Sequence, residues 1–322
     1  MLLHALTAPF QKKSRQGLVL MYHRIANTLS DTWKLAVSPE NFEEHLKVLK
    51  DYHIISIDEL ETTLTKKQQI SDKTIVLTFD DGYLDNYLIG KFLLEKYNIP
   101  ATFFVTTNAI GKLEEFWWDA LERICLLSST LPSKLKLQQP DNITLEIGSS
   151  TNGHVLSSLD LYLRLCEMAR KMKAPQQQTF IKMLEDWAEN SGARPEYFTM
   201  NEKELLDLQS NKLFTIGAHT MSHPFLPDLT YDDQKNEILG SIAFIRTLSG
   251  LAPRYFAYPH GGRDKNTIEI LSQSGISLGF TTDPHGFKDD TYQFIVPRFQ
   301  VCNWDGKTFA FHLKHWMRFN KN

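Results

Sequence analysis

Acidic and histidine side chains follow short apolar runs at separate places in the chain. Asp80 and Asp81 follow one such run, and His219 and His223 follow another. A carboxylate with two imidazoles is a plausible three-ligand set for a catalytic divalent metal ion, because it leaves coordination positions open for water. Adjacent aspartates on an extended strand end point in different directions, so one could bind metal while the other acts as a base.

Each of these signals has a plainer alternative when it is taken alone. Asp-Asp-Gly at 80–82 is good turn chemistry. The spacing of His219 and His223 lets both rings face the same way on one helical turn, but an isolated pair of this kind is as often found in surface or capping histidines. The combination of all three side chains at strand ends favours the metal site.

Short apolar runs that predict β-strands recur along the chain, each followed by a helical pattern. Their continuous hydrophobicity is typical of parallel strands buried on both faces. Helix boundaries are marked by Ser38-Pro39, by a Ser56–Glu59 capping box, and by Gly250 and Gly275. The pattern predicts a distorted (β/α)7 barrel, in which active-site residues lie at the carboxyl ends of the strands. The predicted strands are 17–22, 75–79, 101–106, 213–218, 254–258, 277–281 and 294–296.

A mainly helical insertion is predicted at about 112–210, within one domain that spans residues 1–322. Insertions of this kind supply lids and substrate walls at one end of a barrel. Trp117 and Trp118 start the insertion, and they could stack on a sugar ring or pack in the interior. Its elements are expected at 114–127, 157–172, 178–190 and 202–210 as helices, with a polar, β-leaning piece at 134–147.

Composition excludes several classes of protein. The chain of 322 residues has a formal net charge of −3, which provides no long-range field for nucleic acid. Its three cysteines are far apart, so neither a disulfide framework nor a thiolate zinc site is encoded. The N-terminal sequence lacks the order of a signal peptide and no apolar run reaches the ~20 residues of a membrane span, so we expect a cytoplasmic protein. The stretch 307–322 could contact a membrane surface, or form a helix that closes the barrel.

Three segments together resemble the first three motifs of the polysaccharide deacetylases, carbohydrate esterase family 4. They are Thr-Phe-Asp-Asp-Gly-Tyr at 78–83, His-Thr-Met-Ser-His at 219–223, and Arg-Tyr-Phe-Ala-Tyr-Pro-His-Gly at 254–261. Their order and intervals match, and the resemblance covers roughly 17–110 and 211–300. The insertion is not explained by it. The resemblance implies a βα barrel that removes N-acetyl groups from sugars.

The resemblance also implies roles for individual residues. Asp81, His219 and His223 would hold a divalent metal, usually zinc. Asp80 would be the general base, Arg254 would pair with Asp80 and orient it, and the Tyr258 backbone N–H would help to hold the oxyanion. This chemistry is coherent, because an amide is a poor electrophile that needs a Lewis acid and an activated water.

The sequence departs from the common pattern in its candidate general acid. No Leu-x-His motif follows the last strand, although His312 and His315 are present. Met-Tyr-His-Arg-Ile at 21–25 instead resembles the permuted members that process poly-N-acetylglucosamine, in which His23 would act as the acid. His260 is either a loop histidine or a substrate contact, and Arg298 either reaches the site or forms a structural ion pair.

These observations predict a metal-dependent hydrolase that removes an N-acetyl group from an amino sugar in a glycan or glycan precursor. One alternative is a deformylase or another amide or ester hydrolase on the same barrel, because a fold and a metal site do not define the acyl group. The other alternative is a non-catalytic glycan-binding module. It is disfavoured, because Asp80, Asp81, both histidines and Arg254 are all present.

Overall fold

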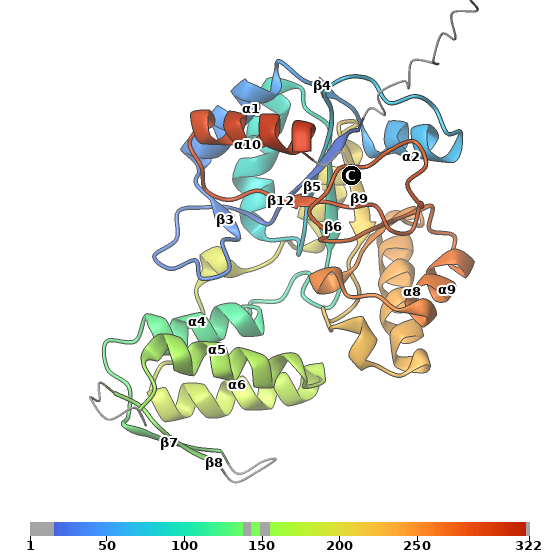
Figure 1. Cartoon of the computed structure of the whole chain (residues 1–322). Helices are drawn as coiled ribbons and strands as arrows, with labels where there is room; N and C mark the ends of the chain where they lie inside the picture. The colour runs from blue at the N-terminus through green and yellow to red at the C-terminus, as the bar shows by residue number, and fades with distance from the viewer. Residues whose placement is uncertain (1–15, 138–142, 149–154, 320–322) are drawn as a thin grey trace, which may run out of the picture.

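The computed structural model describes residues 16–137, 143–148 and 155–319. A parallel sheet runs through its centre in the order β11-β10-β9-β6-β5-β1-β12, and β4 pairs with β5 off this path (Figure 1). These strands are β1 (Leu18–Tyr22), β4 (His53–Ile54), β5 (Thr74–Phe79), β6 (Ala101–Val105), β9 (Phe214–Ala218), β10 (Tyr255–Ala257), β11 (Leu278–Phe280) and β12 (Phe299–Gln300).

The sheet curls into a distorted barrel. Every residue of β1, β5 and β6 is buried, as expected for parallel strands covered on both faces. Val296, which precedes β12, forms a parallel bridge with Phe280 of β11. Because this bridge joins the segment at one end of the sheet to the strand at the other, the two sheet edges approach each other.

The seventh strand lies slightly later in the chain than predicted. Residues 294–296 were expected to pair regularly, but regular pairing occurs at Phe299 and Gln300, which lie beside Leu20 and Met21 of β1. Pro297 separates the bridge at Val296 from this pairing. Proline lacks an N–H donor, so it interrupts a hydrogen-bonded ladder.

The helices around the sheet begin and end where the sequence signals predicted. Ser38 caps the first helix, and Ser56 and Glu59 form the capping box of the second. Gly250 ends α8 with a φ of 75°, a left-handed conformation that glycine adopts without a steric penalty. The outer helices are α1 (Pro39–Leu49), α2 (Ile57–Thr65), α3 (Lys91–Tyr97), α7 (Glu202–Ser210), α8 (Tyr231–Ser249), α9 (Lys265–Gln273) and α10 (Gly306–Phe319).

Short elements lie in the connections. A small parallel pair is formed by β2 (Arg24–Ile25) and β3 (Ala36–Val37). The single-turn helices are η1 (Asn86–Gly90), η2 (Pro195–Tyr197), η3 (Leu226–Asp228) and η4 (Pro259–Gly261).

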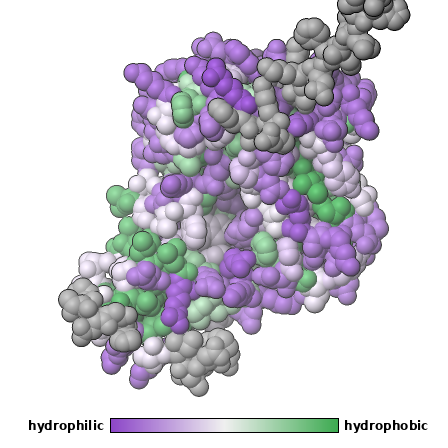
Figure 2. All heavy atoms as spheres, in the orientation of Figure 1, coloured by the Kyte–Doolittle hydropathy of each residue, from purple (hydrophilic) through white to green (hydrophobic). Residues whose placement is uncertain are grey.

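Most of the segment between β6 and β9 forms a separate helical layer, at the lower left of Figure 1. It contains α4 (Trp117–Leu126), the antiparallel hairpin β7 (Lys134–Leu137) and β8 (Ile143–Glu146), α5 (Ser158–Arg170), and α6 (Ala174–Ala188). These elements share their own apolar core. Hydrophobic side chains also gather on the outer surface of this layer in Figure 2.

One predicted insertion helix belongs to the barrel instead. The helix predicted at 202–210 is α7, which packs on β9. Its Leu205 and Leu208 are buried in the core of the barrel rather than in that of the insertion. The distinct helical layer therefore ends before α7.

The C-terminal helix closes the barrel, as one of the two alternatives predicted. Phe309 and Leu313 of α10 are fully buried, and α10 packs on α1. Within the described residues, no helix is long and apolar enough to cross a membrane. The N-terminal stretch used in the signal-peptide argument and residues 320–322 lie outside the described residues.

Candidate metal centre and active site

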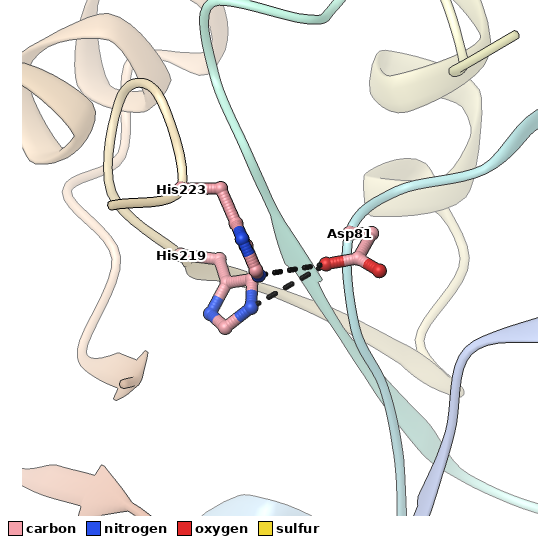
Figure 3. A group of neighbouring side chains, drawn as sticks. All are labelled: Asp81, His219 and His223. Carbon is pink, nitrogen blue, oxygen red and sulfur yellow. Dashed lines mark ion pairs between the residues drawn. The ribbon is translucent and has the colours of Figure 1, made fainter. Parts of the chain in front are cut away.

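Asp81, His219 and His223 come together at the carboxyl ends of β5 and β9 (Figure 3). Oδ1 of Asp81 lies 3.5 Å from Nε2 of His219 and 3.3 Å from Nε2 of His223. All three side chains are buried, and their ligand atoms lie within 4.8 Å of one another. The arrangement brings one anionic oxygen and two imidazole nitrogens to a single point.

The two histidines are carried by a loop, not by the helical turn that their spacing suggested. Thr220 has a φ of 64° and His223 a φ of 59°, so the chain after β9 turns through left-handed conformations. Glu237 of α8 supports this loop. Its carboxylate accepts hydrogen bonds from the backbone N–H groups of Met221 and Ser222, each at 2.9 Å, and from the Ser222 hydroxyl.

These side chains fit a divalent metal ion. Nδ1 of His219 lies 2.8 Å from the carbonyl oxygen of Ala257, so this nitrogen donates its hydrogen and leaves the Nε2 lone pair directed at the site. Oδ1 of Asp81 is buried without a hydrogen-bond donor among the described residues. A buried carboxylate oxygen without a donor is costly, and a cation between it and the two imidazoles would satisfy it.

The electrostatics of the pocket differ between the two histidines. Burial lowers the pKa of His219, but the Asp80 and Asp81 carboxylates raise it above its ordinary value overall. Burial, together with His260 and His219, holds the pKa of His223 well below its ordinary value. The two imidazoles therefore have different surroundings, because carboxylates lie beside His219 and other imidazoles lie beside His223.

Asp80 is paired with Arg298, not with Arg254. Nη1 and Nη2 of Arg298 each lie 2.7 Å from one oxygen of Asp80, and Arg298 is fully buried. Burial alone would raise the pKa of Asp80, but Arg298 and His219 lower it below its ordinary value. Asp80 is therefore ionised at neutral pH and held in one orientation.

The predicted pairing of Arg254 with Asp80 is wrong. Arg254 directly precedes β10, so it lies at the amino end of that strand, whereas Asp80 follows the carboxyl end of β5. Its partners are Glu61 and Asp58 of α2. Its side chain is 56% exposed. Arg254 is thus part of a surface ion-pair cluster at the opposite end of the barrel from Asp81, His219 and His223.

The predicted oxyanion role of Tyr258 does not agree with the structure either. The Tyr258 backbone N–H donates to the carbonyl oxygen of Phe280 at 3.0 Å, and its hydroxyl donates to that of Phe294 at 2.9 Å. Tyr258 is fully buried. Because its N–H group continues the sheet ladder, it is not available to a substrate.

His23 and His260 both line the cavity that contains Asp81, His219 and His223, and its volume is about 520 Å³. His23 follows β1 and is partly buried, and its Nδ1 atom has no hydrogen-bond partner among the described residues. The ring of His260 lies 4.7 Å from that of His223. His312 and His315 lie on α10, which packs on α1, and neither lines this cavity.

Comparison with known proteins identifies the family. A model of the polysaccharide deacetylase family matches residues 67–279. The Bacillus subtilis (strain 168) protein named "Putative polysaccharide deacetylase YxkH" is 39% identical over 285 residues, which cover 88% of this chain and 70% of that protein. The chain belongs to the polysaccharide deacetylase family. This is a family of metal-dependent enzymes that remove N-acetyl groups from glycans.

Solved structures confirm the fold. IcaB from Ammonifex degensii superimposes with a TM-score of 0.62 at 19% identity, over 95% of this chain and 98% of that one. The Streptococcus pyogenes deacetylase PplD, in complex with acetate, gives a TM-score of 0.60 at 20% identity, over 95% and 99% of the two chains. The predicted distorted (β/α)7 barrel is therefore correct.

The active-site cavity of this deacetylase has a second wall that the motifs did not predict. Leu163, Cys166, Glu167 and Arg170 of α5 line it together with Trp117 and Trp118 of α4. An amphipathic pattern identified α5 as a helix, but it could not show which face would meet the barrel. The insertion thus contributes directly to the cavity that holds the candidate metal-binding residues.

Trp118 has the packing role that was one of its two predicted alternatives. Its ring stacks on Phe116 at a centroid distance of 4.4 Å and lies 4.8 Å from the ring of His223. Its Nε1 donates to the Tyr83 hydroxyl, which in turn donates to the buried carboxylate of Asp119. This chain of contacts joins the start of the insertion to the loop that carries Asp81.

Proposed function

We propose that the protein uses a divalent metal ion, zinc in particular, to remove N-acetyl groups from an amino sugar in a glycan or glycan precursor. The observation that carries this proposal is the convergence of Asp81, His219 and His223 beside an Asp80 carboxylate held by Arg298. One carboxylate and two imidazoles match the ligand set of catalytic zinc sites. When bound, the metal would polarise the acetyl carbonyl group and lower the pKa of a nearby water.

Asp80 is the proposed general base. Its oxygens lie next to the metal ligands, since Oδ2 of Asp80 is 4.0 Å from Nε2 of His219. Arg298 keeps Asp80 ionised, so it can accept the proton of the attacking water at neutral pH. Arg298 acts through Asp80, as a positioning residue.

His23 is the proposed general acid. The amine cannot leave as an anion, so a side chain must protonate the nitrogen when the tetrahedral intermediate collapses. His23 lines the same cavity as Asp80 but comes from a different strand, and its Nδ1 has no partner among the described residues. His260, at the same cavity, is the proposed substrate contact.

Metal removal is the first test. Chelation should abolish turnover, and added zinc or cobalt should restore it, because bulk water is too weakly ionised at neutral pH to attack an amide. Acetate and formate release should be measured together, over a panel of N-acetyl and N-formyl amino sugars and their oligomers. Release of formate alone would favour the deformylase alternative, and tight glycan binding without any release would favour the binding module.

The adjacent aspartates provide a matched pair of variants for the same test. Asp81→Asn removes the anionic ligand and should lower zinc occupancy, as measured by elemental analysis. Asp80→Asn should keep the metal and reduce the rate by roughly 10²- to 10⁴-fold. If the two variants showed the reverse pattern of occupancy, the assigned roles would be exchanged.

A further inference from the structure

A second cavity lies between the insertion and the barrel, next to the one that holds the metal ligands. Its volume is about 510 Å³, close to that of the first. It is lined by α4 and α6 on one side and by the segments that follow β6 and β9 on the other, including Asn108 and Ser222. Ser222 is the neighbour of the metal ligand His223, so this cavity adjoins the metal-binding loop.

Trp117 lies between the two cavities. Among the described residues, it is the only side chain that lines both. Its Nε1 atom is buried, and it has no hydrogen-bond acceptor among the described residues. An indole combines an apolar face with one donor, and leaving that donor unpaired costs free energy that a ligand oxygen would recover. A ligand that extends from one cavity to the other must pass this ring.

The chemistry of the second cavity suits a neutral sugar. It contains the partly exposed aromatic rings of Phe116 and Trp117, and amide side chains such as Asn108 and Gln178. Amides both donate to and accept from hydroxyl groups, and aromatic faces pack on apolar C–H surfaces. Of the described side chains, three cationic and four anionic ones line it, and Arg123 is paired with Glu115 and Glu185. The cavity therefore has no excess of positive charge that would select an anion.

We propose that this second cavity binds a sugar unit adjacent to the one that is deacetylated, so that the substrate is an oligosaccharide or longer chain. The proposal rests on the proposed function of the first cavity. The sugar that carries the scissile acetamide lies at the proposed metal ligands, and the chain passes Trp117. A neighbouring sugar then lies between the helices α4 and α6 on one side and the segments that follow β6 and β9 on the other. The insertion then selects for chain length.

One face of α6 offers a variant that fills the second cavity. Ala174, Gln178, Ile181 and Lys182 line it at helical spacing, whereas Thr179 does not. Gln178 and Thr179 are both exposed and adjacent, so Gln178→Trp and Thr179→Trp place the same large side chain on different faces of the same helix. Neither residue lines the cavity of the metal ligands. Lys182→Trp is a second filling variant, should Gln178→Trp fail to fold.

The test compares substrates of different length on the zinc-loaded protein. The probes are an umbelliferyl acetate ester and β-1,4- and β-1,6-linked N-acetylglucosamine oligomers of one to six units. For the unmodified protein, kcat/KM should rise at least fivefold from monosaccharide to oligomer in one series, equivalent to about 1 kcal/mol. Gln178→Trp should remove this rise in kcat/KM and keep the rate of ester hydrolysis within twofold of that of the unmodified protein. Thr179→Trp should retain both the rise and the ester hydrolysis.

Different failures have different meanings. Ester hydrolysis without faster turnover of any oligomer would overturn the second binding site and leave the proposed function intact. If kcat/KM still rose with chain length in both Gln178→Trp and Lys182→Trp, the second binding site would also be overturned. If the zinc-loaded protein hydrolysed neither the ester nor any oligomer, the proposed function itself would fail, and this inference with it.

Discussion

Replacing Arg298 by methionine tests which arginine supports the general base. Arg298 donates to both oxygens of Asp80, to the carbonyl oxygen of Thr281 and to the Thr78 hydroxyl. Methionine has no donor, so Arg298→Met leaves a buried carboxylate without its counter-charge. Removing one partner of a buried pair typically costs about 3–5 kcal/mol of unfolding free energy. The rate should fall by roughly 10²- to 10⁴-fold, because Asp80 is no longer held for proton transfer.

Arg254→Met is the matched control. Arg254 pairs with Glu61 and Asp58 at the surface, and surface pairs contribute only about 0–1 kcal/mol. Urea-induced unfolding at pH 7, zinc content and turnover should be measured for both variants. The double variant Asp80→Asn/Arg298→Met should recover part of the lost stability, since it leaves no unpaired charge. If Arg298→Met destabilised the protein no more than Arg254→Met, the pairing with Asp80 would not have the role assigned to it.

Three further predictions concern other residues. His23→Ala should lower kcat on an amide by roughly 10²- to 10⁴-fold with unchanged zinc content, and the loss should shrink on an activated ester, whose leaving group needs no proton; an equal loss on both substrates would mean that His23 positions substrate. Glu237→Gln should weaken zinc affinity by about 10- to 100-fold in a competitive chelator titration, because the loop between His219 and His223 loses an anionic acceptor; unchanged affinity would count against this support. Burial lowers the pKa of His45 to about 4, so this side chain binds a proton more tightly in the unfolded chain than in the folded one. The free energy of unfolding should therefore fall by about 2–3 kcal/mol from pH 7 to pH 4.5. His45→Gln should lose that part of the pH dependence in urea unfolding, and an identical pH profile would refute the reasoning.

Local sequence was sufficient for most of the strands, the helix boundaries and the candidate metal-binding residues. Continuous apolar runs identify buried parallel strands, and capping residues such as Ser56 and Gly250 mark helix ends because they satisfy local backbone groups. Asp80, Asp81, His219 and His223 could be placed at one end of the barrel in advance, because they follow strands whose carboxyl ends meet there. The resemblance to the family motifs then assigned Asp81, and not Asp80, to the metal. The rule for strand ends depends on chain direction alone.

The same rule could have excluded Arg254. It stands directly before β10 rather than after it, and this strand of three residues is about 10 Å long. A side chain at its amino end lies on the wrong side of the barrel for Asp80. The prediction that Arg254 pairs with Asp80 came from the resemblance to the family motifs, which does not take this position into account.

Tertiary structure decided the remaining features, because each depends on which distant segments meet. The partner of Asp80 is Arg298, more than 200 residues away, and only the packing of the strands brings the two together. The Tyr258 N–H is not available to a substrate, because β11 lies beside β10 and the carbonyl oxygen of Phe280 accepts its hydrogen bond. The amphipathic pattern of α5 and α6 shows that each has an apolar face but not what that face covers. Assembly of the insertion against the barrel determines that α4 and α5 line the cavity beside Asp81, His219 and His223, and that Trp117 lies between this cavity and a second one.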